Sequence, residues 1–527
     1  MRRLIILLLV SVLALGFGVM RHMARDAEVA ESRAIAMGIR SDTRRMPSQA
    51  TSTDDPPLKR PNILLIVADD MGWRDVGYHG SEIRTPAIDE LSRTGVALNR
   101  FYAHPSCSPT RAALMTGKSP LRLGIFDPLS KKNPTGLPLS ETTLAKRLQK
   151  AGYQTALTGK WHLGPRNLNY HPNARGFDHF YGNLTGGVGY YDKVHGGGYD
   201  WQRNGETVRE PGYTTHLIAR EAMRVIEERD TERPLFLYVA FGAPHLPNEA
   251  PAATVASYSH IEDESRRYHA AMVTELDAAV GEIRESLRRE GIENETLIWF
   301  MSDNGGLYPY NPLRFLPEPL LKIGVERRFG ISATPLFVDF IRTNLRDGGA
   351  DNRPFKGAKQ SVQEGGVRVP SVIHWPATLG SAPFNQMATV QDVMPTLLQV
   401  AGIDGVPGDF DGRSLWPSLR TGAPIEPMDY LVTSNAFDMT ALYRYPHKLV
   451  SMGGKLQLYN LETDPFEDDD LASQLPAIRD SMHESLTAFP RAQSIALPLQ
   501  QIVDDPDYFG GTEDREPWAE QAYWPDS

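Results

Sequence analysis

Four short apolar runs, each closed by polar residues, constrain the fold of this chain most strongly. They are PNILLIVADD (61–70), PLFLYVAFGAPH (234–245), TLIWFMSDNG (296–305) and VPSVIHWP (369–376). A continuous apolar run of this length is typical of a strand that is buried on both faces of a parallel sheet. Helical patterns lie between them, including 139–152 and 264–290. The alternation predicts an α/β domain with a mostly parallel central sheet flanked by helices.

From about residue 427 the pattern changes to short runs separated by turn-like clusters, namely YLVTS, ALYRY, HKLVS and LQLYNL. A helical pattern follows at 471–489. This order predicts a smaller C-terminal subdomain over 427–490, in which a short antiparallel sheet packs against one helix. The last stretch, 491–527, is rich in Pro and acidic residues, and we expect it to lie along the surface as an arm.

The first 25 residues resemble an export signal. Arg2 and Arg3 precede an apolar run from Leu4 to Met20, and a charged stretch follows. The length of the run suits either a cleaved signal peptide or an uncleaved membrane anchor, and both remain open. Residues 26–60 carry scattered charge with Ser, Thr and Pro, which predicts a linker. We therefore expect an exported protein that is periplasmic, secreted or anchored by its N-terminus.

Polar oxygen side chains close two of the predicted strands. Asp69 and Asp70 end the first run, and Asp303 and Asn304 end a later one. The carboxyl ends of parallel strands share one edge of a sheet, so the four side chains would form a site for a hard cation such as Ca²⁺ or Mg²⁺. Each pair, taken alone, also suits a turn or a helix cap.

Cys107 is the only cysteine of the 527 residues, which excludes disulfides within the chain and sites that need several cysteines. A helical pattern begins at this residue, and an N-terminus of a helix favours negative charge on sulfur. The alternative is a small buried hydrophobic residue. The net charge is −10, from 55 basic and 65 acidic residues, which argues against a nucleic-acid partner.

The segment CSPTRAALMTGKSP at 107–120 resembles the signature of the type I sulfatases, whose core is C-x-P-x-R. Five more motifs follow the order of that family: DDMGW, GKWHLG, APH, DNGG and KGAKQSVQEGGVRVP. The resemblance covers roughly 61–463 and implies the alkaline-phosphatase-like fold, with a catalytic domain over 61–426. Residues 182–201, which are rich in Gly and aromatic side chains, further resemble the arylsulfatase B (N-acetylgalactosamine-4-sulfatase) branch.

The resemblance implies that a maturation enzyme oxidises Cys107 to Cα-formylglycine, whose hydrate attacks sulfur and later expels sulfate. It implies one divalent cation, with Ca²⁺ favoured over Mg²⁺, held by Asp69, Asp70, Asp303, Asn304 and the modified Cys107. The matched basic residues are assigned roles by the same resemblance. Arg111 steadies the activated hydroxyl, Lys160 binds sulfate, His162 contacts the formylglycine, His245 contacts sulfate, and Lys359 lies beside the leaving oxygen.

The implied reaction is removal of sulfate from a sulfated carbohydrate, such as a fragment of a glycosaminoglycan or another sulfated polysaccharide, and an aryl sulfate is a further possible substrate. Two alternatives remain: a phosphonate monoester or phosphodiester hydrolase of the same superfamily, and an inactive protein that binds sulfated glycans. Residues 182–201 suit either a sugar-binding rim or an ordinary loop. Residues 307–351 form an insert relative to the branch, and we expect a lid, a wall of the site, an oligomer contact or a neutral elaboration there.

Overall fold

A computed structural model of the chain describes residues 28–38, 60–195, 198–308, 317–403, 409–434, 438–505 and 517–521. The predicted signal or anchor at 1–25 lies outside these residues. Within the described residues, no helix has both the length and the apolar character needed to cross a bilayer.

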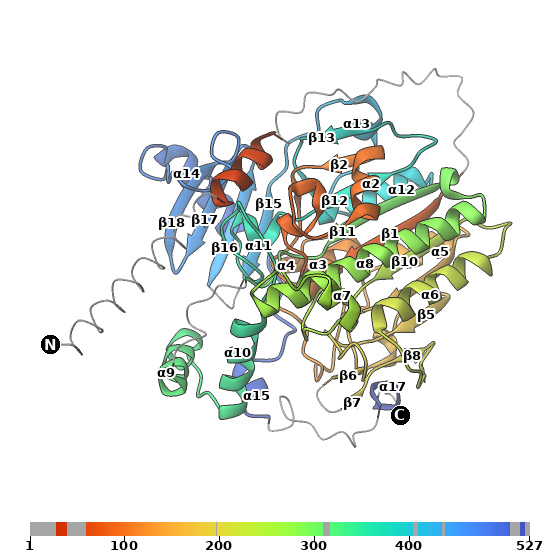
Figure 1. Cartoon of the computed structure of the whole chain (residues 1–527). Coiled ribbons are helices and arrows are strands. Elements are labelled where there is room, and N and C mark those ends of the chain that lie inside the picture. The colour runs from red at the N-terminus through yellow and green to blue at the C-terminus, as the bar shows by residue number, and fades with distance from the viewer. Residues whose placement is uncertain are drawn as a thin grey trace, which may run out of the picture.

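A ten-stranded sheet forms the centre of the molecule (Figure 1). Its strands, in spatial order, are β13 (Ala382–Phe384), β2 (Val96–Leu98), β12 (Ser371–His374), β11 (Thr296–Ser302), β1 (Asn62–Ala68), β10 (Leu235–Ala240), β4 (Gln154–Gly159), β5 (His179–Gly182), β8 (Gln202–Arg203) and β9 (Glu206–Thr207). The five strands from β11 to β5 run parallel. The prediction of a mostly parallel centre is confirmed.

The run at 369–376, which we predicted as another strand of the parallel set, forms β12 and pairs antiparallel with β11. β12 in turn pairs antiparallel with β2, so that edge of the sheet is mixed. Periodicity reports that a strand is buried on both faces but carries no information on its direction. Both strand directions bury equally well under the helices that cover the sheet.

Helices cover both faces of the sheet because alternate side chains of each central strand point to opposite sides. Ile63, Leu65 and Val67 of β1 pack with α3 (Cys107–Thr116), α5 (Leu144–Lys150), α12 (Val393–Val400) and α13 (Trp416–Thr421). Leu64 and Ile66 face the other way, against α2 (Pro86–Thr94), α6 (Thr214–Glu227) and α8 (Glu264–Arg289). The two layers explain why β1 is apolar throughout.

The predicted C-terminal sheet is present as four antiparallel strands, β15 (Tyr430–Ser434), β16 (Met439–Arg444), β17 (His447–Met452) and β18 (Lys455–Asn460). The helix α14 (Pro476–Ala488) packs on one face through Met482 and Leu486. The other face packs on the larger domain through Tyr102, Val362 and Val367. This sheet therefore lies directly behind α11 (Glu364–Val367), a short helix that follows Lys359.

The predicted linker differs from the structure over residues 28–38, which form a helix. Arg33 pairs with Asp468 at 2.9 Å and lies over the ring of Phe466, while Glu28 pairs with Arg353. The sequence AEVAESRAIAM is rich in helix-forming residues. The linker prediction treated 26–60 as one segment, and the polar residues later in that segment masked the local helix preference.

The insert forms two helices, α9 (Glu318–Phe329) and α10 (Pro335–Asp347), which pack with α15 (Leu499–Val503) of the predicted C-terminal arm (Figure 1). The two ends of the insert are held together at its base. The amide of Ala350 donates to the carbonyl of Leu307 at 3.0 Å, and Asn352 bonds Gly306 through both its amide nitrogen and its oxygen. The insert therefore emerges beside Asn304. A short helix at the other end of the arm, α17 (Trp518–Gln521), contacts the hairpin of β6 (Val194–His195) and β7 (Gly198–Tyr199).

Candidate active site

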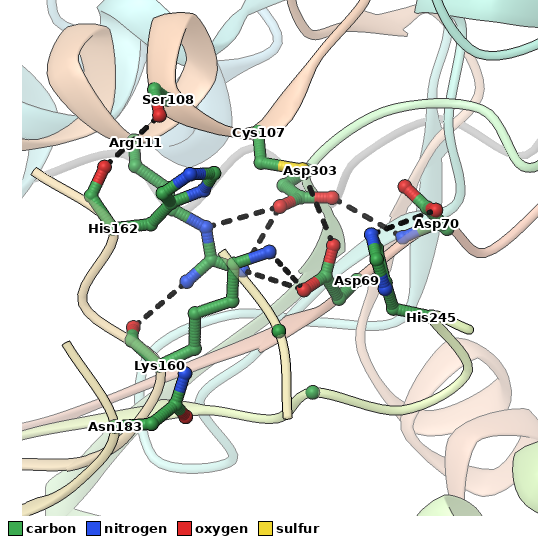
Figure 2. Close-up of polar contacts among 12 residues, drawn as sticks. Asp69, Asp70, Cys107, Ser108, Arg111, Lys160, His162, Asn183, His245 and Asp303 are labelled. Carbon is green, nitrogen blue, oxygen red and sulfur yellow. Dashed lines mark hydrogen bonds and ion pairs between the residues drawn. The ribbon is translucent and has the colours of Figure 1, made fainter. Parts of the chain in front are cut away.

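The predicted site residues converge because four parallel strands end at the same edge of the sheet. Asp69 and Asp70 follow β1, Lys160 follows β4, His245 lies beyond β10, and Asp303 follows β11. The helix α3 begins at this edge and contributes Cys107 and Arg111. Figure 2 shows the carboxylates of Asp69 and Asp303 between the cysteine and the basic side chains.

Cys107 is the first residue of α3 and is 2% exposed. Its thiol donates to Oδ1 of Asp69 at 3.5 Å. Burial raises the pKa of the Cys107 thiol to about 12, and the charges of Asp69 and Asp303 act in the same direction. Lys160 and Lys359 oppose this shift without overcoming it. The helix N-terminus therefore does not produce a thiolate here, and the unmodified cysteine is a poor nucleophile near neutral pH.

Arg111 lies one turn after Cys107 and is buried. Its Nε and Nη2 atoms donate to Oδ2 of Asp303 at 3.1 and 2.9 Å, and Nη1 donates to the carbonyl of Lys160 at 2.9 Å. The guanidinium thereby joins α3, β11 and β4. Its direct partner is the carboxylate of Asp303, so its first effect is to orient that group.

Lys160 and Lys359 neutralise the two aspartates after β1. Lys160 Nζ lies 2.5 Å from Oδ2 of Asp69, and Lys359 Nζ lies 2.8 Å from Oδ2 of Asp70. Burial alone would raise the pKa of Asp69, but Lys160, His245, Arg111 and Lys359 together hold it well below its usual range. Burial, followed by the charge of Asp69, raises the pKa of Asp303 to about 7. The two buried carboxylates therefore titrate far apart.

His162 has a left-handed backbone conformation, with φ at 59°. Its Nε2 atom donates to the carbonyl of Leu129 at 3.0 Å, which leaves Nδ1 as a bare acceptor. That Nδ1 atom is buried and has no hydrogen-bond partner among the described residues. Burial and the charges of Lys160 and Arg111 lower the pKa of His162 well below its usual value. Trp161, between the two site residues, packs in the core.

His245 points toward the carboxylates from the loop after β10 (Figure 2). Its Nδ1 atom donates to the carbonyl of Leu246 at 2.7 Å, and Nε2 lies 3.7 Å from Oδ2 of Asp70. Burial and the charge of Lys359 lower its pKa. Possible ligand atoms of Asp69, Asp70, Cys107 and His245 all lie within 4.8 Å of one another, which is the spacing of a metal-compatible group.

Asn304 completes this arrangement. Its Nδ2 group donates to Oδ1 of Asp70 at 2.7 Å and to the carbonyl of Gly305 at 2.9 Å. Its Oδ1 atom is buried and lacks a hydrogen-bond partner among the described residues. A buried amide oxygen without a donor has the chemistry of a ligand for a hard cation.

The domain model named "Sulfatase" matches residues 61–403 of the chain. The chain belongs to the sulfatase family. It is 33% identical to the arylsulfatase G of Rattus norvegicus, over 85% of this chain and 88% of that protein. It is 32% identical to the N-acetylgalactosamine-6-sulfatase of Homo sapiens, over 69% and 66% respectively. The crystal structure of Ps i-CgsB in complex with k-i-k-neocarrahexaose matches with a TM-score of 0.72 and 29% identity, over 86% of this chain and all of that one.

These matches confirm the sulfatase family, the alkaline-phosphatase-like fold and the activity class, which is hydrolysis of sulfuric esters. The family uses a formylglycine and a divalent cation, and the group around Asp69 is compatible with a metal. The finer resemblance to the arylsulfatase B branch is not decided by these matches and stays a prediction.

Two features of the sulfatase site escaped the sequence interpretation. Ser108 Oγ donates to the backbone carbonyl of His162 at 3.0 Å and accepts from the amide of Leu129 at 2.9 Å, so it ties the backbone of the histidine to the residue whose carbonyl binds the histidine ring. It occupies a variable position of the C-x-P-x-R motif, and the motif assigns no role to its variable positions. The second feature is the segment 182–201. Its composition suits a sugar-binding rim or an ordinary loop, but its Tyr190 and Trp201 are buried in the core.

The hydroxyl of Tyr190 donates toward the carbonyls of Gly242 and His245, each at 2.9 Å. This segment of the sulfatase thus supports the histidine loop from behind. Alternating aromatic and glycine residues carry no periodic signal, so sequence alone does not separate a supporting aromatic from an exposed one.

Proposed function

We propose that this sulfatase removes sulfate from sulfated carbohydrates with a formylglycine formed from Cys107. The observation that carries this proposal is the setting of Cys107, which is buried among carboxylates with a raised thiol pKa. These neighbours do not activate a protonated thiol as a nucleophile. They would activate an aldehyde hydrate at the same position, because a cation and a proton acceptor beside it would favour loss of its proton. That hydrate would supply one hydroxyl to attack sulfur as the ester alcohol leaves, and a second hydroxyl whose proton loss would expel sulfate and regenerate the aldehyde.

We assign one divalent cation to Asp69, Asp70, Asp303, Asn304 and the modified Cys107, and favour Ca²⁺ over Mg²⁺. The unpartnered Oδ1 of Asn304 and the clustered carboxylates support the assignment. A cation bound there supplies positive charge to the sulfate oxygens and to the nucleophile. Oxygen ligands that converge from several loops suit Ca²⁺, which tolerates irregular geometry.

The remaining residues would accept or donate protons, bind sulfate or stabilise charge. His162 presents its unpartnered Nδ1 as the acceptor for a proton from the hydrate, because the carbonyl of Leu129 fixes its tautomer. Lys160 and His245 would contact sulfate oxygens, and Lys359 would stabilise the leaving oxygen or protonate it. Arg111 would steady the nucleophile and the carboxylate of Asp303.

The printed names of two relatives favour a sugar as the carrier of the sulfate. One is an N-acetylgalactosamine-6-sulfatase, and one structure contains a neocarrahexaose. For the same reason we favour an exported enzyme that meets glycosaminoglycan or other polysaccharide fragments outside the cytoplasm. The export segment at 1–25 and the maturation enzyme that would oxidise Cys107 belong to this proposal. The domain limits at 61–426, 427–490 and 491–527 are also part of this proposal.

The test begins with the intact mass of the peptide that contains Cys107, after coexpression with a formylglycine-generating enzyme. Conversion of the thiol to an aldehyde is expected, and an unchanged thiol contradicts the mechanism. Cys107→Ser and Asp303→Ala should each abolish turnover. A panel of defined sulfated monosaccharides and oligosaccharides then identifies the sugar. Matched phosphate esters and phosphonates test the alternative hydrolase, and binding without hydrolysis would indicate an inactive lectin.

A further inference from the structure

A cavity of about 380 Å³ opens between the predicted catalytic domain and the predicted C-terminal arm, and none of the site residues described above lines it. Its walls come from two parts of the chain that are far apart in sequence. One wall carries the basic side chains of Lys132 and Arg166, and the other, in the C-terminal arm, carries Leu497, Gln501, Ile502 and Asp505. We refer to this cavity as the arm pocket.

The arm pocket is tied to the catalytic centre through short stretches of chain. Arg166 is four residues after His162, and Lys132 is three residues after Leu129, whose carbonyl binds the ring of His162. At about 3.4 Å per extended residue, the two pocket residues lie within roughly 14 and 10 Å of those anchors. A substrate of a few sugar rings spans that distance.

The two basic residues of the arm pocket differ in how they are compensated. Lys132 forms an ion pair with Asp505. The Nε atom of Arg166 is buried without a hydrogen-bond partner, and the described residues contain no ion pair of Arg166. The Arg166 side chain as a whole is partly exposed, so the rest of its guanidinium is open to a ligand. A planar or tetrahedral oxyanion would accept from the buried Nε and from the exposed nitrogens together. Among the described residues, the pocket therefore has one cation without a carboxylate partner, and it has the donors to bind one acidic group.

We propose that the arm pocket binds a second acidic group of the carbohydrate substrate, a sulfate ester or a carboxylate, while the scissile sulfate lies at Cys107. This inference rests on the proposed carbohydrate substrate and adds to it the requirement for a second negative charge. Arg166 is the main contact. Lys132 contributes less because it already forms an ion pair with Asp505.

The insert acquires a role in this arrangement. The apolar wall of the pocket belongs to the segment that contains α15, and Leu499 and Val503 of α15 pack on Leu321, Val325 and Phe337 of the insert. The helices α9 and α10 therefore support the arm segment that forms one wall of the pocket. The insert thus influences substrate choice through the arm.

The kinetic test compares Arg166→Ala with the wild-type enzyme, both carrying formylglycine. Three substrates are used: an aryl sulfate, a monosulfated oligosaccharide, and the same oligosaccharide with a second sulfate or a carboxylate. Loss of a charged hydrogen bond should lower kcat/KM for the last substrate roughly 10- to 100-fold, mainly through KM. The other two should change less than about threefold, and Arg166→Lys should recover part of the loss. Equal losses on all three substrates, or none, would overturn the proposal.

Two further variants sharpen the result. Asp505→Asn releases Lys132 and should strengthen binding of the second acidic group, the opposite of Arg166→Ala. Lys150→Ala removes one exposed positive charge before β4, at the opposite edge of the sheet from Lys160, and serves as the charge-matched control. A loss in Lys150→Ala equal to that in Arg166→Ala would show an effect of net charge and overturn the proposal.

Calorimetry separates this proposal from the proposed function. The Cys107→Ala variant cannot turn over, and it is titrated with the two oligosaccharides and with inorganic sulfate. The oligosaccharide with the second acidic group should bind at least 10-fold more tightly than the other, and Arg166→Ala should remove the difference. An absent difference, or one that survives Arg166→Ala, contradicts the arm pocket. Wild-type enzyme that fails to hydrolyse either sugar while the difference persists contradicts only the proposed function. Inorganic sulfate competing at the pocket would identify a free-anion site and overturn the substrate subsite.

Discussion

Replacing Lys448 with Met should destabilise the contact between the catalytic domain and the C-terminal sheet. The Nζ atom of Lys448 lies 3.1 Å from Glu364 and 2.8 Å from Glu467, and its side chain is fully buried. Glu364 also accepts from Tyr102 and Tyr443 at 2.9 and 3.1 Å. Removal of the lysine leaves two buried carboxylates with one less cation, a loss that costs about 3–5 kcal/mol in comparable cases.

Protonation of Glu467 limits this cost. Burial already raises its pKa in the wild-type protein, where Lys448 opposes the shift. Without Lys448 the folded-state pKa rises further above the unfolded value of about 4.3, so the variant loses stability at high pH and regains it as the pH falls. The loss should therefore be largest near pH 8 and shrink toward pH 5, by about 1.4 kcal/mol for each pH unit over which Glu467 protonates.

Chemical denaturation followed by circular dichroism at pH 8 and pH 5 measures the effect. Lys455→Met removes an exposed lysine from the neighbouring strand β18 and is the control, with an expected change below about 0.5 kcal/mol. The double variant Lys448→Met/Glu467→Gln should recover most of the loss, because it removes the carboxylate left without a partner. A loss below about 1 kcal/mol at pH 8, or one that does not depend on pH, would refute the reasoning.

Three further predictions concern residues nearer the catalytic centre. Ser108→Ala removes the bonds to Leu129 and to the carbonyl of His162, so kcat on an aryl sulfate should fall about 10-fold with little change in KM, and an unchanged kcat would argue against positioning. Asn304→Ala should weaken Ca²⁺ binding roughly 10- to 100-fold by calorimetry, and unchanged affinity would exclude it as a ligand. Burial lowers the pKa of His104 to about 3, so protonation of the unfolded state should lower the free energy of unfolding by about 2 kcal/mol between pH 6.5 and pH 5. Chemical denaturation of His104→Gln should show a correspondingly smaller loss of stability over this pH range, and an equal loss in both proteins would contradict this.

The part of the site that depends on strand ends was predictable from the sequence. Asp69 and Asp303 follow apolar runs, and the convergence of parallel strands at their carboxyl edge brings these residues together without further information. The four C-terminal strands were also predictable, because each alternates or is bounded by turn residues. In both cases a local pattern determines the structure.

The features that the sequence did not predict depend on contacts between distant segments. The hydroxyl of Ser108 bonds residues of two separate segments, and Arg166 lines a pocket whose other wall comes from the distant C-terminal arm. The direction of β12 follows from its partner rather than from its own residues. No pattern within a window of ten or twenty residues records such contacts.

The charges of the catalytic centre also explain how an acidic protein attracts a sulfate ester. The cations Arg111, Lys160 and Lys359 are matched by three carboxylates, of which Asp69 and Asp70 lie nearest the lysines. The histidines add no positive charge near neutral pH, because burial lowers the pKa of both His162 and His245. Because the pKa of Asp303 is raised to about 7, this carboxyl is only partly ionised near neutral pH, and the side chains together carry little net charge. A bound divalent cation would supply most of the positive charge that an anionic ester needs. For this reason we expect chelation to weaken substrate binding as well as turnover, so that a chelated enzyme shows reduced affinity for an uncleaved sulfate ester.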